Sequence, residues 1–217
     1  FDLGNLPFIH RIASLGKPVV MSVGGGKIDQ IRSSVEALLN HHNKVSILHC
    51  VSEYPCEYSR LGLDNIEELI KEFPGCTIGS SDHFNGTLSG PVAYMKGARV
   101  FEKHVTLNRA WKGTDHSFAL EPDGFRKFVR DIKRVRYMMP PKSADDLGNE
   151  SVFKKLGKSL IAYVDIKEGD KITLDSLSGR IFNAQYIPVR ESKQLIGRVA
   201  KKNIAQGEAI QYVDLEG

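Results

Sequence analysis

The chain has 217 residues, of which 41% are hydrophobic and 26% are charged, values that are ordinary for a globular protein. No apolar run in these 217 residues approaches the roughly 20 residues of a membrane-spanning helix. The net charge of +4 comes from scattered side chains whose densest stretch, 127–136, has the spacing of a solvated helix face and not of a nucleic-acid surface. Cys50, Cys56 and Cys76 form no Cys-x-x-Cys pair, so reduced cysteines in a cytosolic protein are expected.

Apolar strands alternate with amphipathic helices through the first 138 residues. Short strands at this interval are typical of successive βα units with a parallel sheet. Four such units make half of an eight-stranded barrel of ~250 residues. Since half a barrel leaves open strand edges, we expect further units upstream. The predicted strands are 18–23, 44–50, 76–79 and 98–102, and the predicted helices are 28–39, 63–73, 88–96 and 123–138.

The chain continues differently after the last predicted helix. Residues 139–152 are polar, contain prolines and lack periodicity, which predicts a linker. The part from 153 to 217 contains an internal repeat, because Ile-x-x-Gly-x-x-Ile at 166–172 recurs at 204–210. The repeat predicts a compact, pseudo-symmetric, β-rich module.

Two segments each contain a histidine at the end of a strand-like run. They are Gly79-Ser80-Ser81-Asp82-His83 and Phe101-Glu102-Lys103-His104-Val105-Thr106. If the two strands are neighbours in a parallel barrel, both imidazoles point into one mouth, where a metal ion and a small polar substrate would bind. Strand alternation predicts Glu102 and His104 on one face of a buried strand and Lys103 on the other.

Five strings in this order, followed by the duplicated module, resemble the sialic acid synthase family, the N-acetylneuraminate synthases. The resemblance implies an α/β fold, the (β/α)8 TIM barrel, of which about four βα units are present here. Residues 1–138 would be the C-terminal half of that barrel, 139–152 a linker, and 153–217 a small β-rich SAF or antifreeze-like domain. The strings are Gly16–Ser22, Leu48–Pro55, Ser81–His83, Gly97–Leu107 and Gly113–Pro122.

Members of this family condense phosphoenolpyruvate with N-acetylmannosamine, or its 6-phosphate, to form N-acetylneuraminate, or its 9-phosphate, and phosphate. The resemblance therefore implies a divalent metal cofactor, Mn²⁺ or Mg²⁺, a domain-swapped homodimer and a cytoplasmic setting. The chemistry is consistent with the residues, because a Lewis acid makes an aldehyde electrophilic. An imidazole pair suits Mn²⁺, with waters and substrate oxygens completing its coordination.

The resemblance also assigns roles to individual residues. The metal ligands would be His83 and His104, and Glu102 would join them as a catalytic residue that orients a ligand. Phosphoenolpyruvate would contact serine hydroxyls, and Asp115 would contact the amino-sugar. The full set of substrate-binding residues is Ser22, Ser52, Tyr54, Ser81, Asp115 and Arg180.

Three positions depart from the family's pattern. Arg180 would be the arginine that reaches the sugar from the partner subunit, but Arg180-Ile-Phe-Asn stands where relatives have Arg-Pro-Gly, and Arg190 and Arg198 are alternatives. Some relatives have Asn in place of Ser52. Residues 23–26 read Val-Gly-Gly-Gly where relatives have Thr-Gly-Met, and such a glycine-rich backbone can approach an anion.

Other readings of the sequence remain open. One alternative acceptor sugar is a 2,4-diacetamido hexose, as in legionaminic and pseudaminic acid synthases, although residues 111–117 look closest to N-acetylneuraminate synthases. The chain could instead be a non-catalytic fragment that binds sugar or assembles with another chain. A third alternative is a barrel aldolase with Lys103 as Schiff-base lysine, which strand alternation opposes.

Overall fold

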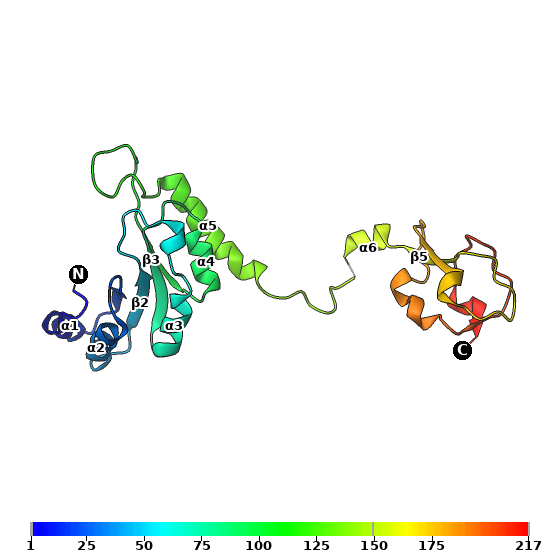
Figure 1. Ribbon diagram of the computed structural model, residues 1–217, viewed down its shortest axis with the longest axis horizontal. Helices are drawn as coiled ribbons and strands as arrows, with labels where there is room; N and C mark the ends of the chain where they lie inside the picture. Colours follow the sequence, from blue (N-terminus) through cyan, green and yellow to red (C-terminus); the bar gives the residue numbers. More distant parts are fainter. Residues whose placement is uncertain (1, 149, 217) are drawn as a thin grey trace. The chain divides into compact units, whose positions relative to one another are not determined.

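A computed structural model describes residues 2–148 and 150–216. The chain divides into two compact units, Phe1–Pro140 and Pro141–Gly217, which are described one at a time (Figure 1). Among the described residues, no helix is both long and apolar enough to cross a membrane. The domain boundaries expected from the sequence, at 138 and 153, stay a prediction.

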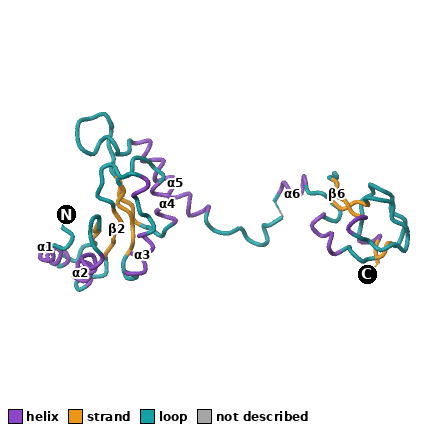
Figure 2. Tube along the Cα trace, in the orientation of Figure 1, coloured by secondary structure: helices purple, strands orange, loops and turns teal. Residues whose placement is uncertain are grey.

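The first unit is an α/β unit whose strands are all parallel and pair in chain order, β1-β2-β3-β4 (Figure 2). A helix precedes β1 and a helix follows each strand. The strands are β1 (Val19–Ser22), β2 (Val45–Cys50), β3 (Thr77–Asp82) and β4 (Val100–Lys103), and the helices are α1 (Leu6–Ala13), α2 (Ile28–Leu39), α3 (Asn65–Glu72), α4 (Ser89–Met95) and α5 (Pro122–Met138), with a 3₁₀ turn, η1, at Tyr58–Arg60.

Alternation along the strands gives this sheet two different faces. On the helix side, Ile47 and Ile78 pack with Val35, Leu38 and Ile66 in the apolar core of the unit. We call the opposite side the inner face. Since the helix layer buries only one side of the sheet, the inner face is left to carry the polar side chains described below.

The predicted βα rhythm is confirmed, and most predicted bounds lie within two residues of the observed ones. The helix predicted at 28–39 is α2, residue for residue. The third strand was predicted to end at 79, but it pairs with β2 as far as Ser81 and with β4 as far as Asp82, because main-chain pairing continues where apolar character stops. Helix α1 was not predicted; Asn5 caps it by accepting from Phe8 N at 3.4 Å, and proline lies in its first turn.

The second unit has little regular strand, so "β-rich" overstates it. Two antiparallel pairs, β5–β6 and β7–β8, are joined by turns and 3₁₀ helices. A short helix, α6, overlaps the end of the expected linker. The elements are α6 (Ser151–Leu156), β5 (Ser159–Ala162), η2 (Leu174–Ser176), β6 (Leu177–Arg180), η3 (Val189–Gln194), β7 (Val199–Ala200), η4 (Tyr212–Asp214) and β8 (Leu215–Glu216).

The internal repeat is confirmed as a pseudo-symmetric exchange of main-chain hydrogen bonds. Gly169 N donates to Ala200 O at 2.8 Å, and Gly207 N donates to Ala162 O at 2.8 Å. The two glycines hold φ of 89° and 82°, a left-handed conformation that a side chain would strain. Each half of the unit therefore supplies the acceptors that the other half needs.

One close approach between strands gives a stability prediction. A Cβ at Gly79 would lie 2.5 Å from Leu48 Cδ2 and 2.9 Å from the Val100 carbonyl carbon. We expect Gly79→Ala to lower the free energy of unfolding by about 1–3 kcal/mol, because the neighbouring main chain cannot move away cheaply. Urea denaturation followed by circular dichroism measures it. The matched control is Gly75→Ala, which meets nothing within 4 Å and should be near neutral; equal effects at both positions would contradict the argument.

Candidate active site

A cleft of about 480 Å³ lies on the inner face, at the carboxyl ends of the parallel strands. Side chains from all four strand ends line it, and α1 contributes apolar side chains. Of the nine predicted site residues, all except Asp115 and Arg180 line this cleft. The polar lining residues are Asp2, Ser22, Cys50, Ser52, Tyr54, Ser81, His83, Glu102 and His104.

His83 is held in one tautomer. The residue is 4% exposed, and its Nδ1 lies 2.7 Å from the carbonyl oxygen of Val51. Because a carbonyl only accepts, Nδ1 carries the proton and Nε2 keeps its lone pair. Burial lowers the pKa of His83 below its ordinary value, an effect that outweighs the hydrogen bond to Val51. The ring is therefore a neutral imidazole, the form that binds metal ions.

His104 lies beside His83 on the neighbouring strand end. The two ring centroids are 5.2 Å apart, and the Tyr54 ring packs 4.0 Å from the His83 ring. On its other side, His104 Nδ1 is 3.7 Å from the Asp115 carboxylate. This distance is longer than a hydrogen bond, so the carboxylate lies beside the ring without a direct hydrogen bond to it.

Glu102 and Ser81 form a short hydrogen-bonded pair across β3 and β4. Ser81 Oγ donates to Glu102 Oε1 at 2.6 Å, and the two residues are register partners on the inner face. Glu102 was expected in a buried strand, but the residue is exposed because no helix covers this face. Cys50, the register partner of Ser81 on β2, lies with its sulfur 4.0 Å from His83 Nδ1. Burial raises the pKa of the Cys50 thiol, so it stays protonated at neutral pH.

The main chain at Gly24 approaches the side chains of the cleft closely. A Cβ there would lie 2.5 Å from Ser52 Oγ and 2.9 Å from Cys50 Sγ. Gly25 follows with φ of 74°, which favours glycine. The loop after β1 therefore needs glycine at these two positions, and it brings a bare backbone beside Ser22 and Ser52.

Asp115 faces a second hollow, of about 330 Å³, that His104 also lines. His116 borders the same hollow, where its Nδ1 lies 2.8 Å from Thr106 Oγ1. Arg180 belongs to the second unit, where it ends β6 with its guanidinium 5.7 Å from the Phe182 ring centroid. Its expected contact with the sugar stays a prediction.

The sequence analysis missed the partners that hold these residues in place. Val51 O orients His83, and Asp82 receives Lys103 Nζ at 2.8 Å on the helix side of the sheet. The predicted orientation of Lys103, away from Glu102 and His104, is confirmed. Asp82 and Lys103 each directly precede a predicted metal ligand. This shared position in the sequence could have indicated that the two side chains pair.

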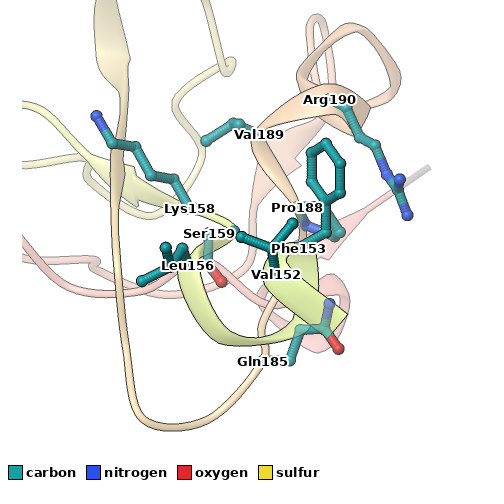
Figure 3. A pocket seen from close by; sticks show the side chains of 10 residues that line it. Val152, Phe153, Leu156, Lys158, Ser159, Gln185, Pro188, Val189 and Arg190 are labelled. Carbon is teal, nitrogen blue, oxygen red and sulfur yellow. The ribbon is translucent and has the colours of Figure 1, made fainter. Parts of the chain in front are cut away.

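The second unit contains a separate hollow of about 330 Å³ between α6 and the start of η3 (Figure 3). It is mainly apolar, with Val152, Phe153 and Leu156 opposite Pro188 and Val189. No carboxylate, imidazole or thiol is among its lining residues. The hollow therefore lacks the groups that acid–base or metal chemistry requires.

The cleft offers few side chains that could bind a metal ion. Among the described residues, no group of three or more His, Cys, Asp or Glu side chains could hold one. His83 and His104 supply two imidazole donors with free ring nitrogens, and water and substrate oxygens would fill the other positions. Imidazole binds first-row transition metals, so Mn²⁺ suits this donor set better than Mg²⁺, which prefers oxygen ligands.

Comparison with known proteins decides the family. The model described as NeuB family matches residues 1–143, most of the chain. The chain belongs to the NeuB family. It is 31% identical to the N-acetylneuraminate-9-phosphate synthase of Homo sapiens over 100% of this chain and 61% of that protein. It is 29% identical to the N,N'-diacetyllegionaminic acid synthase of Campylobacter jejuni over 97% of this chain and 64% of that protein.

Solved structures share the arrangement of the sheet. The N-acetylneuraminic acid synthetase of Leptospira borgpetersenii is 28% identical, with a TM-score of 0.63, over 71% of this chain and 55% of that one. The four parallel strands form the curled half-barrel seen in such synthase structures. The chain spans about three fifths of the length of the curated relatives it matches.

The tautomer of His83 can be measured. In the metal-free protein, we expect the Nδ1-protonated neutral form, with a titration midpoint below the ordinary 6.5 because burial penalises the imidazolium. Long-range ¹H–¹⁵N correlation spectra over a pH series would show both, with His83→Asn to assign the signals. An Nε2-protonated ring, or a midpoint at or above 6.5, would contradict the geometry.

Proposed function

We propose that this chain carries the metal- and substrate-binding part of a synthase that joins phosphoenolpyruvate to N-acetylmannosamine, or to its 6-phosphate. The products would be N-acetylneuraminate, or its 9-phosphate, and phosphate. The observation that carries the proposal is the convergence of an imidazole pair, three serines and the Glu102 carboxylate on one inner-face cleft. Membership of the NeuB family, with relatives named as synthases at about 30% identity, supports it.

The phosphoenolpyruvate end would lie against Ser22, Ser81 and the loop that begins at Gly24. Hydroxyls and unhindered main-chain amides are suitable partners for phosphate and carboxylate oxygens. Glu102 accepts from Ser81 Oγ at 2.6 Å and would fix the direction of that hydroxyl. The role of Glu102 would therefore be to orient the Ser81 hydroxyl toward phosphoenolpyruvate.

His83 and His104 would hold a divalent metal ion, Mn²⁺ or Mg²⁺, which as a Lewis acid makes the aldehyde carbon of the open-chain sugar electrophilic. C3 of phosphoenolpyruvate attacks that carbon, water adds at C2, and the C–O bond to phosphate breaks. No protein nucleophile is needed. The side chains of the cleft align the two substrates and stabilise the charge that develops at C2.

The sugar would occupy the side of the cleft that Ser52 and Tyr54 line, and would extend toward Asp115 in the hollow beside His104. Arg180 would reach it from the partner subunit of a domain-swapped homodimer, with residues 153–217 as an SAF or antifreeze-like domain. We place the enzyme in the cytoplasm. Nucleic acid and membrane play no part in the proposed reaction.

Metal-dependent phosphate release tests the proposal. We expect phosphate from phosphoenolpyruvate only with N-acetylmannosamine, or its 6-phosphate, and Mn²⁺, with complete loss in EDTA. His83→Ala and His104→Ala should each lower the rate by at least about 100-fold, because even residues behind the ligands are worth about 10–100-fold. His10→Ala, an exposed histidine of α1 that does not line the cleft, is the matched control.

The assay would use this chain and a chimera that adds the upstream barrel strands of the human relative. 2,4-Diacetamido hexoses would serve as further acceptors, since turnover with them alone would make the product a legionaminic- or pseudaminic-type acid. Inactivation by borohydride would indicate a Schiff-base lysine instead. Mn²⁺ binding without turnover on any acceptor in the chimera would reject the synthase proposal and favour a binding role.

A further inference from the structure

A buried polar network lies behind the cleft, on the helix side of β3 and β4. Lys103 Nζ donates to Asp82 Oδ2 at 2.8 Å, and the two side chains are only 1% and 3% exposed. Ser89 Oγ, in the first turn of α4, donates to Asp82 Oδ2 at 2.5 Å, and Phe84 N donates to Oδ1 at 2.9 Å. Lys103 Nζ also donates to the Phe84 carbonyl. The charges are thus paired and further hydrogen-bonded.

The ion pair joins the last matched positions of two strands. Asp82 and Lys103 are register partners, and the paired ladder of β3 and β4 ends with them. His83 and His104 are the next residues in each strand, and alternation turns them to the inner face. The Asp82–Lys103 ion pair is therefore one residue away from each predicted metal ligand.

After the Asp82–Lys103 pair, the main chains of the two histidines no longer pair with each other but form hydrogen bonds with different segments. Cys56 N donates to the His83 carbonyl at 3.0 Å, and Leu120 N donates to the His104 carbonyl at 2.9 Å. The sheet ladder thus does not itself fix the separation of the two rings. Asp82 and Lys103 are the nearest interaction that connects one strand end directly to the other.

A buried ion pair is a poor source of stability, because desolvation offsets much of the attraction. Apolar side chains could fill this position at similar or better stability. The directional hydrogen bonds of this ion pair fix the position of the main chain. Asp82 accepts from Phe84 N and Lys103 donates to Phe84 O, and Phe84 directly follows His83. The network is therefore better suited to fixing the position of the residues beside His83 than to stabilising the fold.

We infer that Asp82 and Lys103, with Ser89, are positioning residues that set the separation of His83 and His104 and so the affinity of the cleft for a divalent cation. The inference rests on the proposed function only through the metal ion. It gives Lys103 a task other than Schiff-base chemistry, because its amine faces the helix layer. Asp82, Lys103 and Ser89 take no direct part in the proposed condensation.

The test is the double variant Asp82→Asn/Lys103→Met, which removes both charges and leaves neither unpaired. Its matched control is Asp64→Asn/Lys96→Met, the same substitutions at an ion pair of 2.7 Å on the helix side, where the side chains are 82% and 32% exposed. Mn²⁺ alone is the probe, titrated by electron paramagnetic resonance into the full chain. We expect dissociation constants about 10–100-fold higher for the double variant and unchanged for the control.

A second readout separates this inference from the proposed function. In the metal-free chain, the ring signals of His83 and His104 should shift in the double variant and stay in place in the control. If the unaltered chain binds no Mn²⁺, the metal assignment fails, and a shift confined to the double variant still supports the positioning role. Unchanged ring signals and unchanged Mn²⁺ affinity in a folded double variant would overturn the inference.

Ser89→Ala keeps the test decisive if the double variant does not fold. It removes one hydrogen bond to Asp82 and leaves the ion pair whole, so we expect a folded protein with Mn²⁺ affinity lowered several-fold. Circular dichroism would confirm the fold. Unaltered affinity and ring signals in Ser89→Ala, together with an unfolded double variant, would show that the network serves the fold alone.

Discussion

In the pairing of β3 with β4, Ser81 lies beside Glu102 and Asp82 lies beside Lys103. Because side chains alternate, the first pair faces the cleft, the second faces the helices, and the two histidines that follow face the cleft again. A slip of one residue in both strands would turn both imidazoles into the helix layer and put the buried ion pair in the cleft. The register is therefore the constraint on which the whole site depends.

The register also determines which kinds of side chain lie on each face of the sheet. On the helix side, Ile47 and Ile78 lie in the apolar core, and the cost of the charges at the strand ends is met by pairing them. On the inner face, Ser81 and His83 are also buried, at 5% and 4% exposure, while Glu102 is exposed and accepts a hydrogen bond from Ser81. Gly79 fits the same division, since it lets β3 approach Leu48 and Val100 with no side chain of its own.

The sequence predicted most of this fold because its signals are local. The period of apolar residues from 28 to 39 is a property of that segment alone, and it located α2 to the residue. The end of β3 could not be found this way, because Ser80, Ser81 and Asp82 are strand only through pairing with neighbours. Helix α1 is short, and the sequence analysis did not recognise its amphipathic pattern.

The same limit applies to the site. Alternation and position after a strand predicted which residues share the cleft, and these are facts of chain order. The carbonyl of Val51 that fixes the His83 tautomer has no side-chain signature, since any residue offers a carbonyl. The exposure of Glu102 depends on what covers the inner face, which strand periodicity does not encode.

In the proposed site, two protein side chains would hold the metal ion. Its affinity would then depend on the separation of the two imidazoles and on the orientation of each ring. Orientation is supplied to His83 by a carbonyl, and a carboxylate lies beside His104. On the inner face, the hydrogen bond from Ser81 Oγ to Glu102 Oε1 joins the same two strands two residues before each histidine. The buried Asp82–Lys103 ion pair joins them one residue before each histidine, on the opposite face, where it occupies no space in the cleft.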